Sequence, residues 1–179
     1  MAGKSDGITM TVLVAIVGGT NSGKTTLIEK LVPVLLRRGF RVGTVKHAKH
    51  GFVPDQAGKD SRRHASAGAE TVVVDAGETI VMFRSLPSGL SDMDRLKNHI
   101  YRHFEGADIV IVEGYKGLPL PKIEVYRRSQ AAQPICSQHD TLLAVASDDA
   151  IETDVSVYGL DDIESIADMI VSLEPIGWS

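Results

Sequence analysis

The sequence predicts an α/β fold, a three-layer α/β/α sandwich around a mostly parallel β-sheet with one added β-hairpin. Two observations carry this prediction. Short β-branched runs alternate with helical stretches along the chain. The first run, residues 12–17, is apolar at every position, as a central parallel strand must be when helices cover both faces of its sheet. A glycine-rich turn then leads from this run into a helix.

The helix after that turn is predicted over residues 24–38. Apolar residues recur there at i, i+4 and i+8 from Leu27, which gives the helix one buried stripe. Gly39 follows directly and suits the position after a helix end, where the backbone turns left-handed. Pro33 conflicts with this assignment, because it removes one helical hydrogen bond and should kink or weaken the helix.

The other elements follow along the chain. Residues 70–75 and 78–84 are rich in β-branched side chains and are joined by Ala76-Gly77, so they form the predicted hairpin. Residues 129–140 have no clear periodicity. The remaining elements are strands at residues 41–46, 108–113, 122–127 and 142–147 and helices at residues 59–67, 91–104 and 163–173.

Composition limits the function classes. The 179 residues carry 19 basic and 23 acidic side chains, a net charge of −4 that argues against a general nucleic-acid binder. The single Cys136 excludes an intrachain disulfide and an all-cysteine metal cage. The longest early apolar run is too short to span a bilayer. We expect a cytoplasmic protein without a membrane segment, with a flexible terminus over residues 1–9 and a single domain over residues 10–175.

The turn after the first strand matches the pattern G-x-x-x-x-G-K-[ST], the Walker A motif or P-loop. Glycines let successive backbone N–H groups curl around phosphate oxygens, and the helix that follows directs its positive end at the same anion. Lys24 would contact the β- and γ-phosphates, and the Thr25 hydroxyl would bind Mg²⁺. The predicted nucleotide-binding residues of this turn are Gly18, Gly19, Thr20, Asn21, Ser22, Gly23, Lys24, Thr25 and Thr26. The alternative is a glycine-rich turn without a ligand.

A carboxylate is expected beside this turn. Residues 108–113 form an apolar strand that ends in Glu113. Open α/β sheets bind ligands at the carboxyl ends of their strands, so Glu113 should lie near the phosphates. There it would hold Mg²⁺ or orient an attacking water. The alternative is a solvated carboxylate at a strand end.

The segment after the second strand is dense in polar residues and should emerge at the same edge of the sheet. Asp60, or Asp55, is a further candidate for the metal. Lys59 and Arg62 suit phosphates or another anionic ligand. His47-x-x-His50 has the spacing of a partial transition-metal site, which is weak evidence without a third ligand.

A second carboxylate ends the strand at residues 142–147. Asp148 can accept two hydrogen bonds from guanine, at N1–H and at the exocyclic amine, whereas adenine presents an acceptor at N1. Asp148 is therefore the candidate for reading the base. The alternative is an ordinary turn aspartate.

Together these motifs resemble a known family, the molybdopterin-guanine dinucleotide biosynthesis adapter proteins (MobB). The resemblance extends from residue 12 to about residue 173. Its motifs are the GGTNSGKTT turn, the VKHAKH, GKDS and AGA groups of residues 45–69, VEGYK ending at Lys116, KIEVYR at residues 122–127, and AVASD ending at Asp148.

The resemblance implies a P-loop NTPase fold that binds GTP and Mg²⁺, usually as a homodimer. It implies an adapter in molybdenum-cofactor biosynthesis that acts beside the guanylyltransferase joining GMP to molybdopterin. Hydrolysis of GTP would be slow at most, with Lys24 and Glu113 as its catalytic residues and Thr25, Glu113 and Asp60 at the metal. Contacts to the partner or to molybdopterin itself are expected from His47, His50, Lys59, Arg62 and Lys116.

Two other functions stay open at this point. A P-loop kinase for a small metabolite would share the turn, although no arginine-dense lid insertion is evident. A GTPase that delivers a metal would use His47 and His50.

Overall fold

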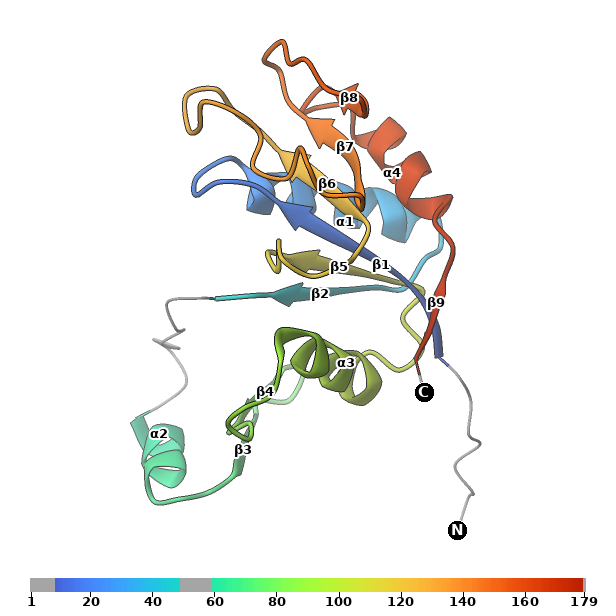
Figure 1. Ribbon diagram of the computed structural model, residues 1–179. Coiled ribbons are helices and arrows are strands. Elements are labelled where there is room, and N and C mark those ends of the chain that lie inside the picture. Colours follow the sequence, from blue (N-terminus) through green and yellow to red (C-terminus); the bar gives the residue numbers. More distant parts are fainter. Residues whose placement is uncertain (1–8, 49–58, 179) are drawn as a thin grey trace. The chain divides into compact units, whose positions relative to one another are not determined.

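The computed structural model describes residues 9–48 and 59–178 (Figure 1). They fall into two compact units, one comprising Met1–His47 with Asp92–Ser179 and the other Ala48–Ser91. In chain order the elements are β1 (Thr9–Val17), α1 (Lys24–Arg37), β2 (Val42–Lys46), α2 (Lys59–Ser66), β3 (Thr71–Asp75), β4 (Ile80–Arg84), α3 (Asp92–His103), β5 (Ile109–Glu113), β6 (Lys122–Val125), β7 (Leu142–Ala146), β8 (Ser156–Tyr158), α4 (Ile163–Val171) and β9 (Ile176–Trp178).

The first unit is built on a seven-stranded sheet. Six strands follow the order β2-β5-β1-β6-β7-β8, and every neighbouring pair in this order is parallel. β9 pairs antiparallel with the first residues of β1. Helices α1 and α4 cover one face of the sheet and α3 lies on the other (Figure 1). The predicted α/β fold with a mostly parallel sheet is confirmed.

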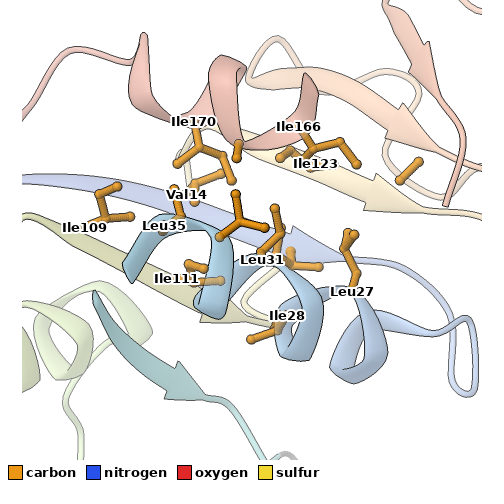
Figure 2. Close-up of a cluster of buried hydrophobic side chains, with 14 of the residues drawn as sticks. Val14, Leu27, Ile28, Leu31, Leu35, Ile109, Ile111, Ile123, Ile166 and Ile170 are labelled. Carbon is orange, nitrogen blue, oxygen red and sulfur yellow. The ribbon is translucent and has the colours of Figure 1, made fainter. Parts of the chain in front are cut away.

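The core follows from the alternation of side chains along β1. Val14 and Ile16 are fully buried against the helices α1 and α4, while Leu13 and Ala15 are buried on the face that α3 covers. Figure 2 shows the first of these clusters, where side chains of α1 interdigitate with those of the sheet and α4. Burial of one such leucine or isoleucine contributes about 1.5–3 kcal/mol, so β1 and α1 hold the turn between them in place.

Pro33 does not end α1, which runs through it to Arg37. The physical reason lies on the helix face: Leu31 and Leu35, on either side of the proline, are completely buried. Tertiary packing of this face outweighs the lost backbone hydrogen bond. The helix then ends as expected, with Gly39 at φ +89°.

Two short strands were not predicted. β8 and β9 have three residues each. β8 lies at the edge of the sheet beside β7, and β9 pairs with the first residues of β1. Residues 129–140 form neither helix nor strand, in agreement with their lack of periodicity. They are instead held by Glu124 of β6, whose carboxylate accepts backbone N–H bonds from Ile135 and Cys136 at 2.7 and 2.8 Å.

The second unit contains α2 and a two-stranded antiparallel sheet of β3 and β4. This pairing confirms the predicted hairpin. The turn is closed by a hydrogen bond from the Ala76 N–H to the Thr79 carbonyl, and Gly77 takes φ +79°. Among the described residues of both units, none of the helices is long and apolar enough to cross a membrane.

Candidate nucleotide site

The turn between β1 and α1 has a backbone that only glycine can adopt at one position. Gly18 takes φ +143°, and a Cβ built there would lie 2.3 Å from the Val125 carbonyl oxygen of β6. Gly23 at φ +104° and Asn21 at φ +58° are also left-handed. At Gly19, by contrast, a Cβ would meet nothing within 4 Å. The successive reversals curl the chain into an anion cradle.

Helix α1 begins at the end of this turn without a side-chain cap and without an acidic residue in its first turn. Its N-terminal N–H groups and the positive end of its dipole are therefore available to an anion. The neighbouring Ser22 hydroxyl is buried and has no hydrogen-bond partner among the described residues. A buried hydroxyl without a partner costs free energy, and such a group fits a site completed by a polar ligand.

The Lys24 side chain folds back toward residues 18 and 19 of the phosphate turn. Its Nζ donates to the Gly19 carbonyl at 2.6 Å and to the Gly18 carbonyl at 3.3 Å. Burial lowers the pKa of Lys24, the nearby Glu113 carboxylate raises it, and the Lys46 ammonium lowers it further. A phosphate bound in the turn would compensate for this burial, because an adjacent anion favours the charged amine.

Thr25 and Glu113 are brought together by the order of the strands. Glu113 ends β5 and lies opposite Ile16 of β1 in the parallel register. The Thr25 hydroxyl lies 3.3 Å from both carboxylate oxygens, and its single O–H proton can be donated to either one. A hydroxyl and a carboxylate are hard oxygen donors of the kind that Mg²⁺ prefers. These two residues therefore fit a magnesium ion.

These groups line one cavity of about 490 Å³. That volume is in the range of small-molecule sites. The residues around it are Thr20, Asn21, Gly23, Lys24, Thr25, Thr26, Lys46 and Glu113. Two lysines and one carboxylate give this lining a net charge of +1, which suits an anionic ligand with a divalent cation.

Asp148, the predicted reader of guanine, is exposed after the end of β7 and does not line this cavity. Its Oδ1 accepts a hydrogen bond from the Leu160 backbone N–H at 2.9 Å. The carboxylate thus ties the turn after β7 to the turn after β8. Asp148 therefore acts as a turn residue in this structure, and its recognition of guanine stays a prediction.

His47 and Lys116 belong to the same unit as the cavity. The His47 ring lies 4.1 Å from the Tyr115 ring, centroid to centroid, and its backbone N–H donates to the Glu113 carbonyl at 2.9 Å. Tyr115 takes φ +51°, which is strained for a side chain of this size. Lys116 follows it and is exposed.

A family model for molybdopterin guanine dinucleotide synthesis protein B (MobB) matches residues 13–148. The chain belongs to the MobB family. A relative from Haemophilus influenzae is 37% identical over 158 residues, covering 88% of this chain and 86% of the relative. One from Escherichia coli is 33% identical over 175 residues, covering 96% and 95%. Both are named molybdopterin-guanine dinucleotide biosynthesis adapter protein.

Solved MobB structures share the fold. A crystal structure titled molybdopterin-guanine biosynthesis protein B superposes with a TM-score of 0.70 at 27% identity, covering 89% of this chain and 98% of that one. Bacillus subtilis MobB gives a TM-score of 0.68 at 26% identity, covering 89% and 96%. The resemblance drawn from the motifs, and the P-loop fold expected from it, are confirmed.

Three predicted residues of the MobB-like GKDS region lie in α2 of the second unit, namely Lys59, Asp60 and Arg62. Asp60 pairs with Arg63 of the same helix at 3.4 Å, and Arg62 is exposed. Their roles at the metal or at a partner stay predictions. His50 and Asp55 lie outside the described residues. Within the described part of the chain, no group of three His, Cys, Asp or Glu side chains is arranged to hold a metal.

Two residues that contact the site, Lys46 and Arg127, were not predicted from the sequence. Lys46 ends β2 and pairs with Glu113. Arg127 follows β6, and its Nε donates to the Ser22 carbonyl at 3.1 Å, so it braces the turn from the neighbouring strand. The signal available for both was their place, at or just beyond the carboxyl end of a strand next to β1 or β5.

A larger hollow of about 590 Å³ lies elsewhere in the first unit. Its lining contains none of the residues predicted for phosphate, metal or base, and consists of Tyr126, Arg128, Ala132, Gln133, Pro134, Ser137, Ala150, Ile151, Glu152 and Thr153. The smaller cavity is the better candidate, because it combines the phosphate turn, a helix N-terminus and the Thr25–Glu113 pair.

Proposed function

We propose that this chain binds GTP with Mg²⁺ at the turn of residues 18–25 and acts as an adapter in the synthesis of molybdopterin guanine dinucleotide, in the cytoplasm, beside the guanylyltransferase. Membership of the MobB family and the names of its relatives support the pathway. The observation that carries the nucleotide site is the convergence of the phosphate turn, the α1 N-terminus, Lys24 and the Thr25–Glu113 pair on one cavity.

Each residue has a distinct task in this proposal. The backbone of the turn and the Lys24 ammonium bind the phosphate chain, and Thr25 and Glu113 hold Mg²⁺. Bound Mg²⁺ would neutralise charge on the phosphate oxygens. His47, His50, Lys59, Arg62 and Lys116 form the contacts to the transferase or to molybdopterin.

Hydrolysis of GTP is slow by itself in this proposal. No glutamine is among the described residues that line the cavity, and Arg127 beside the turn is bonded to the Ser22 carbonyl. In other NTPases an arginine stabilises the transferred phosphate and a glutamine orients the attacking water. Among the described residues that line the cavity, Lys24 and Glu113 would then be the catalytic groups. A partner that supplies an arginine would raise the rate by orders of magnitude.

We also propose that the protein is a homodimer and that the hairpin of the second unit contributes to self-association. Val73 and Met82 are directly opposite each other in the β3–β4 register, and they are 56% and 42% exposed. Ile80 lies two residues from Met82 on the same side and is 67% exposed. Sedimentation velocity of Met82→Glu should show a shift from dimer to monomer, and an unchanged dimer would remove this role of the hairpin.

Calorimetric titration of GTP and of ATP, each with Mg²⁺, tests the nucleotide site. Wild type should bind GTP more tightly than ATP, and Lys24→Ala should lose about a hundredfold in GTP affinity, because it loses a charged contact in a partly buried site. Lys30→Ala is the matched control, since Lys30 is on the same helix and pairs with Asp161 at the surface. Unchanged GTP affinity in Lys24→Ala would contradict the site, and equal affinities for GTP and ATP would contradict guanine recognition.

A further inference from the structure

A lysine ammonium occupies the space between the two side chains proposed to hold the metal. The Nζ of Lys46 lies 3.0 and 3.1 Å from the two carboxylate oxygens of Glu113. It also lies 3.4 Å from the hydroxyl oxygen of Thr25. The same oxygens that fit Mg²⁺ are therefore already in contact with a positive charge.

The strand register puts Lys46 there. Lys46 is the last residue of β2 and lies directly opposite Glu113, the last residue of β5, while β1 and the phosphate turn lie on the other side of β5. Because β2 and β5 are parallel, both side chains leave the sheet at its ligand-binding edge. The contact is thus a consequence of the central sheet and not of a loop.

The two lysines of the cavity divide the site between them. Lys24 donates to the carbonyls of Gly18 and Gly19 in the turn itself. Lys46 donates to the carboxylate and the hydroxyl. Lys24 is thus aligned with the phosphate turn, and Lys46 with the metal ligands.

We propose that the Lys46 ammonium and Mg²⁺ exclude each other at the Thr25–Glu113 pair, so that Lys46 is the resident cation of the metal-free site. This inference rests on the proposed nucleotide site. An ammonium offers only donors, and the lone pairs of Glu113 that face it are not available to a metal in the same position. Two cations on the same carboxylate would also repel each other, and Glu113 is only 14% exposed, so water screens that repulsion incompletely.

Lys46 can leave without disturbing the fold. Its side chain is 63% exposed, and its flexible stem can swing the ammonium into solvent. The consequence is that Lys46 supports binding of a phosphate chain without metal, and that binding with metal includes the loss of the Lys46–Glu113 pair. Lys46 is a positioning residue that sets how strongly nucleotide affinity depends on Mg²⁺.

The test is a ratio for one ligand: its dissociation constant in EDTA divided by its dissociation constant in saturating Mg²⁺. Lys46→Met keeps the length of the side chain and removes its charge. The ratio should rise about tenfold or more in Lys46→Met, because metal-free binding loses a cation and metal entry no longer breaks an ion pair. In the control Lys30→Met, which removes a lysine of the surface pair with Asp161, the ratio should equal that of wild type. An unchanged or smaller ratio in Lys46→Met would overturn the inference.

Three ligands separate this inference from the proposed function: GTP, ATP and inorganic tripolyphosphate. Equal affinities for GTP and ATP would contradict guanine recognition, while the ratio for tripolyphosphate still tests Lys46, because that ligand has no base. Failure of all three to bind wild type would overturn the proposed function and this inference together. Lys46→Arg should keep the ratio within about threefold of wild type, because the cation is retained.

Discussion

Two parts of the predicted site lie at the carboxyl edge of the sheet, and they differ in how many observed contacts support them. At the end of β1 and β5, the phosphate turn, Lys24, Thr25 and Glu113 converge on a single cavity. At the end of β7, Asp148 binds the Leu160 N–H and stands outside that cavity. The backbone of the turn and the strand register both fix the positions of the residues in the first part. The second depends on one carboxylate that already has a structural partner.

The largest expected effect tests the backbone geometry of the phosphate end. Gly18→Ala places a methyl group 2.3 Å from the Val125 carbonyl at φ +143°, so the free energy of unfolding should fall by about 3 kcal/mol or more. Gly19→Ala is the control, because its Cβ would meet nothing within 4 Å, and it should change stability by less than about 1 kcal/mol. Urea unfolding measures both. Equal losses in the two variants would contradict a specific requirement for glycine at position 18.

The next expected effect tests guanine recognition by Asp148 at the end of β7. Asp148→Asn keeps an oxygen that can accept the Leu160 N–H bond but removes the carboxylate, so stability should change little while the preference for GTP over ATP falls about tenfold. Asp148→Ala should lose the preference and also about 1 kcal/mol of stability. Calorimetry and thermal unfolding distinguish the two. If Asp148→Asn retains the full preference, Asp148 is only a turn residue.

A smaller effect concerns the buried hydroxyl of Ser22 in the phosphate turn. Ser22→Ala removes a buried hydroxyl that has no hydrogen-bond partner in the described part of the chain, so the nucleotide-free protein should gain about 1 kcal/mol of stability while GTP affinity falls several-fold. Ser172→Ala is the control with the opposite expectation, because its hydroxyl donates to the Met169 carbonyl at 2.7 Å. A loss of stability in Ser22→Ala would show that the hydroxyl is already satisfied in the free protein.

The smallest effect is a pH dependence at the other end of β5. Hydrogen bonds from the Arg41 side chain and backbone hold the pKa of Asp108 below its ordinary value of 3.8. A lowered pKa stabilises the fold at pH above the ordinary value, and that contribution disappears as pH falls through the lowered pKa. Asp108→Asn should therefore be less stable at pH 7, by under about 1 kcal/mol because the pair is exposed. The difference should vanish in strong acid, and a difference that persists there would contradict this cause.

The parts of the molecule that the sequence predicts are those with a local physical requirement. The phosphate turn requires glycine at a left-handed position, and residues 109–112 are apolar because both faces of β5 are covered. Glu113 follows from the end of that strand. The hairpin follows from its two β-branched runs and the glycine between them.

What the sequence did not predict depends on register or on very short elements. Lys46 contacts Glu113 only because β2 is placed beside β5, and strand order is not encoded locally. Arg127 reaches the turn because β6 lies beside β1. The partner of Asp148 is supplied by the turn after β8, a strand of three residues with no periodicity to detect.

A crystal structure with Mg²⁺ and a non-hydrolysable GTP analogue would show whether the cavity at the carboxyl ends of β1 and β5 binds a guanine nucleotide with its metal. We expect the phosphates within the turn of residues 18–25, Mg²⁺ at Thr25 and Glu113, the base at Asp148, and Lys46 withdrawn from Glu113. Nucleotide density outside this cavity, with the turn unchanged, would contradict this expectation.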